Sequence, residues 1–155
     1  MRRVCLIACS ASKLDRAAPA HEIYTGDVFR KSLTWAKLQT FDDVVVLSPR
    51  HHVVELQDSL QPYDGSMYAM TVDERRRWAS IVFASIDTRW DLRAGGIELV
   101  MLAGAQYAEE LALRIQVVAP RASLVRPLAG VGVGVGQQKA WLRDAIAAQG
   151  RECEG

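Results

Sequence analysis

The sequence has little cysteine, almost no net charge and no long apolar run, and each shortage excludes a class of protein. Its 155 residues include three cysteines, Cys5, Cys9 and Cys153, and none forms a CxxC pair. This pattern argues against both a disulfide framework and a closed zinc site. Lys and Arg total 19 against 18 Asp and Glu, a formal net charge of +1. That balance excludes a protein that holds nucleic acid by bulk positive charge.

The longest apolar runs are too short for a membrane. None reaches the roughly 18 residues of a membrane helix, and VCLIAC at residues 4–9 is too short for a signal-peptide core. We therefore expect a cytoplasmic protein without membrane contact. The length suits one domain, because most domains have roughly 100–200 residues. We expect a single domain over residues 1–150 and a frayed tail over residues 151–155.

Short apolar runs alternate with helical patterns along the chain. The runs are rich in β-branched residues and cover 3–9, 44–48, 97–102 and 122–125. Helical patterns cover 27–39, 71–85, 105–117 and 137–149; Thr71 and Glu74 are spaced as a capping box, and Gly150 follows the last pattern. The alternation predicts an α/β domain, a three-layer α/β/α sandwich with a mainly parallel sheet of about four strands.

Ligands of such sheets bind beyond the carboxyl ends of the strands, which selects the loops 10–26, 49–70, 103–107 and 126–136. The first loop follows Cys9 with Ser10, Ser12 and Lys13. A thiol, two hydroxyls and an ammonium suit an anion, a carbonyl or the polar edge of a base. Taken alone, Lys13 is more often a solvated surface lysine, and Cys9 is more often a small buried residue than a nucleophile.

The second loop contains Ser48-Pro49-Arg50-His51-His52 and then Pro62-Tyr63-Asp64-Gly65. Arg50 could clamp a phosphate with its planar guanidinium, and one histidine could carry a proton near neutral pH. Adjacent histidines point in opposite directions on an extended chain, so we expect no metal site. Asp64 has two interpretations of similar weight, a turn residue that bonds its own backbone and a general base.

The last two loops contain glycines before helical patterns. Gly104 permits close approach of backbone or ligand, and Tyr107 either stacks on a planar ring or packs against the sheet edge. The GVGVGVG run at residues 130–136 matches neither GxGxxG nor a Walker GK[ST] motif. We therefore expect no NTPase activity and no bound cofactor. The run is typical of a flexible lid or a tight turn.

Together these motifs resemble a bacterial and phage domain family of unknown function. The order CSxSK, LYxGxxF, LSxxH, PYD, LAGxxY and PLAGxGxGxQ extends from residue 4 to about residue 145. The first motif is also similar to the CSxxK motif of archaeosine synthase, which modifies a deazaguanine base in tRNA. The matching residues are Cys9, Ser10, Ser12, Lys13, Tyr24, Gly26, Phe29, Ser48, His51, Pro62, Tyr63, Asp64, Gly104, Tyr107, Gly130, Gly136 and Gln137.

The chain departs from this family pattern at three places. Ile23 stands where the family usually has Leu, and His52 stands where we expect Gly. The segment 130–136 is longer than the usual form by a Val-Gly pair. His52 in place of Gly predicts an altered turn after the second strand. The additional Val-Gly pair predicts an altered lid.

The resemblance implies a base-handling enzyme related to N-glycosylases and deazaguanine-modifying enzymes. We expect a hydrolase of DNA glycosylase type that acts on a modified nucleobase, with DNA preferred to RNA or with a nucleobase or nucleoside as its partner. Asp64 would polarise water or stabilise charge on the sugar, while Lys13 and His51 would stabilise the departing base. Substrate contacts are expected from Cys9, Ser10, Ser12, Tyr24, Ser48, Arg50, Tyr63, Gly104, Tyr107 and Gln137, with the tyrosines stacking on the base.

Two other functions stay open. One is modification of a deazaguanine-type base without bond cleavage, with Lys13 acting on a nitrile and a partner protein supplying nitrogen. The other is a non-catalytic module that binds a nucleotide or nucleic acid. Turnover separates both enzymatic hypotheses, base release and base modification, from the binding module. A module binds stoichiometrically, and Lys13→Ala changes nothing in a chemical assay of it.

Overall fold

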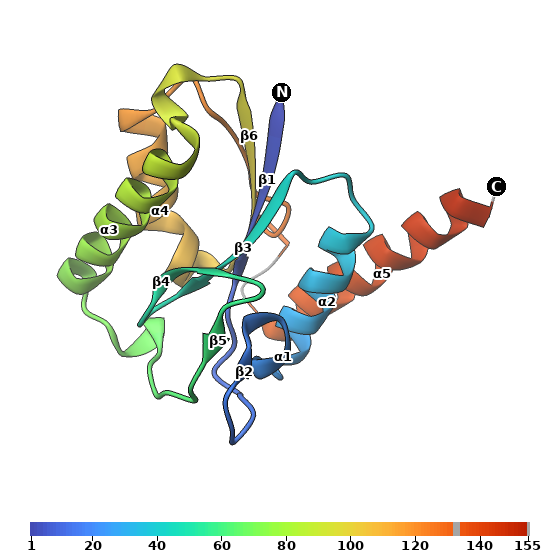
Figure 1. Ribbon diagram of the computed structural model, residues 1–155. Helices are drawn as coiled ribbons and strands as arrows, with labels where there is room; N and C mark the ends of the chain where they lie inside the picture. The colour runs from blue at the N-terminus through green and yellow to red at the C-terminus, as the bar shows by residue number, and fades with distance from the viewer. Residues whose placement is uncertain (132–133, 155) are drawn as a thin grey trace.

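The computed structural model describes residues 1–131 and 134–154, and over these ranges it contains a five-stranded sheet (Figure 1). The strand order is β4-β3-β1-β6-β7, and every neighbouring pair is parallel except β3 with β4. The strands are β1 (Arg2–Ala8), β3 (Asp43–Ser48), β4 (His52–Glu55), β6 (Ile97–Leu102) and β7 (Ser123–Val125). The predicted α/β fold with a mainly parallel sheet is confirmed.

Helices cover both faces of this sheet. The longer ones are α2 (Asp27–Lys37), α3 (Val72–Trp90), α4 (Ala105–Val118) and α5 (Val135–Glu154). In Figure 1, α3 and α4 lie side by side on one face and α2 and α5 on the other. Short elements complete the described chain: α1 (Ala20–Ile23), the 3-10 helices η1 (Met67–Ala69) and η2 (Leu92–Ala94), and the two-residue strands β2 (Ala18–Pro19) and β5 (Ser59–Leu60), which pair antiparallel.

The core has two halves, one on each face of the sheet. Val4 and Leu6 of β1 pack with α3 and α4, whereas Cys5 and Ile7 pack with α1 and α2. All four side chains are fully buried. Because successive strand residues point to opposite faces, a strand covered on both sides must be apolar at every position. Each buried Val, Leu or Ile contributes about 1.5–3 kcal/mol to folding.

The predicted helix starts agree with the structure better than the predicted ends. Glu74 N–H donates to Thr71 Oγ1 at 3.1 Å and Thr71 N–H donates to Glu74 Oε1 at 3.4 Å, which completes the predicted capping box of α3. The pattern at 71–85 nevertheless continues to Trp90. The last pattern was expected to stop at Gly150, yet α5 runs to Glu154. A single glycine costs a helix about 1 kcal/mol relative to alanine but does not have to end it.

The sequence predicts about four strands, and β4 is the additional one. It is an antiparallel edge strand of four residues inside the second loop. So short a strand leaves too little periodicity to be distinguished from a loop.

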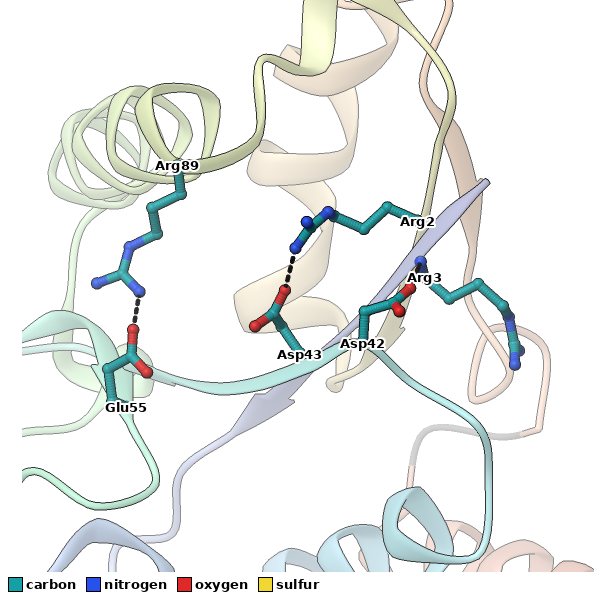
Figure 2. Close-up of polar contacts among 6 residues, drawn as sticks. All are labelled: Arg2, Arg3, Asp42, Asp43, Glu55 and Arg89. Atoms are coloured by element: carbon teal, nitrogen blue, oxygen red, sulfur yellow. Dashed lines mark hydrogen bonds and ion pairs between the residues drawn. The ribbon is translucent and has the colours of Figure 1, made fainter.

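Ion pairs and hydrogen bonds join the amino ends of the strands, the edge of the sheet opposite the site described below (Figure 2). Arg2 Nη1 lies 2.7 Å from Asp43 Oδ2, and Arg3 N–H donates to Asp42 Oδ2 at 2.7 Å. Arg89 at the end of α3 pairs with Glu55 of β4. Exposed pairs of this kind contribute about 0–1 kcal/mol each. None of the helices in the described ranges combines the length and apolar character that a membrane crossing requires.

Candidate functional site

A cleft of about 360 Å³ lies beyond the carboxyl ends of β1 and β6. The chain runs outward from β1 to β3 and β4, and then returns to place β6 on the other side of β1. The strand order thus reverses between β1 and β6, and this is the switch point where α/β sheets bind ligands. The first residues of α2, α4 and α5 also line the cleft. All four predicted loops contribute to it: the loops 10–26, 103–107 and 126–136 line the cleft, and residues 65, 66 and 68 of the loop 49–70 complete the rim.

Two of these helices begin at a glycine and receive no side-chain cap. Gly26 precedes α2 and Gly104 precedes α4. The amide groups of a first helical turn lack partners within the helix and carry partial positive charge. The positive ends of both helices therefore face the cleft, and the glycine that precedes each helix has no side chain to accept from its first-turn amides.

Ser10 and Gly26 are in close contact, which leaves no room for a side chain at residue 26. Gly26 N–H donates to Ser10 Oγ at 3.1 Å, and Ser10 Oγ donates to the carbonyl of Ser12 at 2.7 Å. A Cβ atom at Gly26 would lie 2.5 Å from Ser10 Cβ, closer than real Cβ contacts come. Ser10 thus fixes the path of the CSxSK loop, and Ser12 is exposed at the rim of the cleft.

Three hydroxyls form a chain behind the loops. Tyr63 Oη lies 2.7 Å from Ser48 Oγ and 2.6 Å from Tyr24 Oη. Ser48 Oγ also accepts the backbone N–H groups of Arg50 and His51, at 3.2 and 3.0 Å. Since these two bonds occupy both lone pairs, Ser48 donates its proton to Tyr63. Ser48 and Tyr24 are fully buried, so the chain is a structural core of the site.

Cys9 and Tyr107 form a second polar pair, with Sγ and Oη 3.2 Å apart. Burial raises the pKa of Cys9 above its ordinary value and outweighs the opposing effects of Tyr107 and Lys13. Burial also raises the pKa of Tyr107. Both groups are therefore protonated at neutral pH, which favours the buried interpretation of Cys9 over a nucleophile. The ring of Tyr107 packs edge-on against Trp78, whose Nε1–H donates to the Ser48 carbonyl at 2.8 Å.

Lys13 and Asp64 line a second hollow of about 320 Å³, which shares Ala11 with the cleft. Lys13 Nζ lies 4.3 Å from the ring centre of Tyr63 and donates to the Ala11 carbonyl at 3.1 Å. Within the described ranges, Lys13 has no carboxylate at ion-pair distance, and exposed Asp64 makes no side-chain hydrogen bond. The turn interpretation of Asp64 predicts a bond to its own backbone, and the free carboxylate gives that interpretation no support.

Arg50 and His51 are exposed and line neither hollow. The His51 ring stands edge-on to Tyr63, with ring centres 4.9 Å apart. Partial burial and the positive charge of Arg50 lower the pKa of His51, which leaves it uncharged at neutral pH. His52 has φ of 65°, in the left-handed region that favours glycine, the residue that the family pattern leads us to expect at this position. No three His, Cys, Asp or Glu side chains in the described part of the chain gather as metal ligands would.

Gln137 lies outside the cleft. Its Oε1 accepts the Gly134 N–H at 3.0 Å, so it caps α5, and its side chain is exposed. The neighbouring Gln138 lines the cleft instead, with Nε2 3.2 Å from where a Cβ of Gly104 would be. The lid predicted for residues 130–136 includes residues 132–133, which lie outside the described ranges.

Several polar residues of the cleft have no place in the site predicted from the sequence, among them Gln138 and the four described next. Asp27 at the start of α2 bonds Lys31 at 2.9 Å and lies 3.6 Å from Lys139 of α5; the bond from Lys31 lowers the pKa of Asp27. Gln106 in the first turn of α4 and Tyr68 of η1 complete the set. An acidic residue at a helix start is a recognisable signal, whereas Gln106, Lys139 and Tyr68 have no sequence pattern that indicates a site.

Comparison with protein families gives a match over most of the chain. No curated protein matches the chain. A family model described as "Family of unknown function (DUF6884)" matches residues 4–144, most of the sequence and every motif from CSxSK to the start of α5. The expected membership of a domain family of unknown function is confirmed at that level. The chain belongs to the family of unknown function DUF6884.

Proposed function

We propose that this protein is an enzyme that recognises a nucleobase and cleaves its N-glycosidic bond. The observation that carries the proposal is the junction of two hollows at Ala11. One is the cleft at the switch point, and the other holds an exposed carboxylate, Asp64, and an ammonium, Lys13. Ligand pockets range over roughly 300–1,000 Å³, so a cleft of about 360 Å³ suits a base or nucleoside rather than a dinucleotide.

The two charged groups match the charges that develop in such a reaction. When the C–N bond breaks, its electron pair stays on the base and the sugar becomes positive. Water then adds to the sugar and releases a proton. The Asp64 carboxylate would stabilise the sugar cation and orient the water, and the Lys13 ammonium would stabilise the negative base.

We assign the positive charge to Lys13 alone, not to Lys13 and His51 together. The lowered pKa of His51 leaves its imidazole uncharged at neutral pH. The ring stands against Tyr63, over which Lys13 also lies. His51 and Tyr63 would therefore position Lys13, with the cation–π contact contributing about 0.5–1 kcal/mol.

We propose a modified base in DNA as the substrate. A base in a duplex must leave the stack before it can enter a cleft of this size, and this costs least when the base is damaged or mismatched. The near-neutral net charge gives little long-range attraction to a polymer, which makes RNA and free nucleosides necessary comparisons.

A base-release screen tests the proposal. The protein is incubated with DNA and RNA that carry natural, hydroxymethylated, glycosylated or deazaguanine bases, and with the corresponding nucleosides. Mass spectrometry then measures free base, and the polymer is analysed for abasic sites. Asp64→Asn is the test variant, and Asp15→Asn is the matched control, because Asp15 is an exposed residue of the CSxSK loop that lines neither hollow.

We expect a free base and an abasic site with wild type and Asp15→Asn, and neither with Asp64→Asn. Release by Asp64→Asn at the wild-type rate would remove Asp64 from the mechanism. A mass change that stays in the polymer would indicate base modification of the deazaguanine type. Binding without any chemical change would indicate a non-catalytic module.

A further inference from the structure

Three tyrosines expected to stack on a base are committed to other contacts. Tyr24 is fully buried, and its hydroxyl bonds Tyr63. The ring of Tyr63 lies beneath Lys13, and the ring of Tyr107 packs edge-on against Trp78. These side chains support the walls of the site and leave the stacking surface unassigned.

Tyr68 is the aromatic residue at the rim of the cleft that remains exposed. It lines the cleft, and 75% of its surface is accessible. Its backbone is nevertheless held, because Tyr68 N–H donates to Ser66 Oγ at 3.1 Å and the preceding Met67 is buried in the core. An anchored ring with an open face is the form in which proteins present aromatic stacking surfaces to bases.

Gln106, another residue that lines the cleft, adds an independent observation. Its Oε1 atom is buried, and no donor among the described residues reaches it. A buried acceptor without a donor costs free energy, and native structures leave few of them. A ligand with an N–H group at its edge would satisfy this atom once the Gln106 side chain turns it toward the cleft.

We propose that the cleft binds a planar heterocycle that stacks on Tyr68 and donates an exocyclic amino N–H to Gln106 Oε1. The amino group is the donor that projects furthest from such a ring. The inference rests on the proposed function and narrows its substrate to amino-bearing bases, whose edge the Gln106 side chain selects.

The test is binding of paired deoxynucleosides to the full chain, measured by ligand-observed NMR and calorimetry. Each pair differs by one amino group: deoxyguanosine with deoxyinosine, deoxyadenosine with purine deoxyriboside, and deoxycytidine with 2-pyrimidinone deoxyriboside. Wild type should bind the amino-bearing member of at least one pair about tenfold more tightly, because the other member lacks the amino group and cannot form the buried hydrogen bond to Gln106 Oε1. The ratio should fall to about one in Gln106→Met.

Further variants separate the two contacts. Gln106→Glu keeps the acceptor and should keep the ratio, and Gln116→Met, an exposed position on the same helix, should leave it unchanged. Tyr68→Ala should weaken both members of a pair about tenfold and leave their ratio intact, while Tyr68→Phe should bind like wild type. Circular dichroism and melting curves check that each variant is folded.

The failures of this inference and of the proposed function are distinguishable. Base release that continues at the wild-type rate in Gln106→Met and Tyr68→Ala would leave a glycosylase but overturn the inference. Amino-dependent binding without base release would sustain the inference and remove the glycosylase. If none of the six deoxynucleosides binds, or the amino group makes no difference, the inference is wrong.

Discussion

Replacing Tyr63 with Phe removes one oxygen atom from the centre of the buried hydroxyl chain. Tyr63 Oη bonds Ser48 Oγ at 2.7 Å and Tyr24 Oη at 2.6 Å, and both partners are fully buried. Ser48 Oγ keeps the two backbone N–H groups that it accepts but loses the acceptor for its own proton. Tyr24 loses its hydroxyl partner. The aromatic ring of the phenylalanine retains the apolar contacts and the surface beneath Lys13.

The cost follows from the two hydroxyls left behind. A buried polar group deprived of its partner costs about 1–3 kcal/mol. Because Tyr63 itself is only partly buried, water can reach part of the space, so we expect a total near the lower end, about 2–3 kcal/mol. For a protein of this size, 1 kcal/mol corresponds to about 2–4 °C in Tm. Tyr63→Phe should therefore melt about 5–10 °C below wild type.

Urea unfolding followed by tryptophan fluorescence measures the change in the free energy of unfolding. Tyr24→Phe should cost only about 1 kcal/mol, because Tyr63 keeps Ser48 as a partner. The double variant Tyr24→Phe/Tyr63→Phe should cost about 1 kcal/mol less than the sum, because it removes one stranded hydroxyl. Tyr68→Phe, at an exposed hydroxyl, is the control and should lie within about 0.5 kcal/mol of wild type. A Tyr63→Phe variant as stable as this control, or strict additivity in the cycle, would refute the reasoning.

Three further predictions concern backbone strain, thiol reactivity and pH. His52→Gly should be at least about 1 kcal/mol more stable than His52→Val in thermal unfolding, since a β-branched residue is strained at φ of 65°; equal stabilities would contradict this. Burial raises the pKa of Cys5 to about 12 and also raises the pKa of Cys9. Both thiols should therefore resist iodoacetamide in the folded protein and react with it in urea, as peptide mass spectrometry would measure. Rapid labelling of Cys9 in the folded protein would contradict this prediction. The hydrogen bond from Lys31 lowers the pKa of Asp27, so its carboxylate favours folding above its unfolded pKa, and this contribution disappears as the pH falls through the folded pKa. The urea midpoint of Asp27→Asn should thus be below wild type at neutral pH and converge with it in acid; a constant difference would exclude the linkage.

The central strands were predictable because burial on both faces leaves an unbroken apolar run. β6 begins and ends at the residues that its run predicts, β3 differs by one residue at its start, and β1 differs by one residue at each end. The small elements β2, β4 and β5 have two to four residues, and backbone hydrogen bonds rather than periodicity define them. Such elements depend on what the rest of the chain places beside them.

The candidate site was predictable as a place but not as a set of contacts. The strand-end rule located the loops, and the motif residues Cys9, Ser10, Gly104 and Tyr107 do line one cleft. Gln137 and Gln138 show why the individual contacts were not predictable. Successive side chains on a helix differ in direction by about 100°, so Gln137 caps α5 whereas Gln138 faces the cleft. A sequence without resolved helix phase cannot make that distinction.

The position of β1 in the middle of the sheet has a consequence for how the protein acquires its structure. Arg3 of β1 pairs with Glu98 of β6, 95 positions later, while β1 meets β3 much earlier in synthesis. At roughly 5–20 residues per second, a ribosome takes on the order of several seconds to deliver β6 after β3. During that interval the central strand β1 has one open edge, and its late closure slows folding. The nascent chain is thus most vulnerable to aggregation at its future centre, and a chaperone that shields strand edges would act there rather than at the cleft.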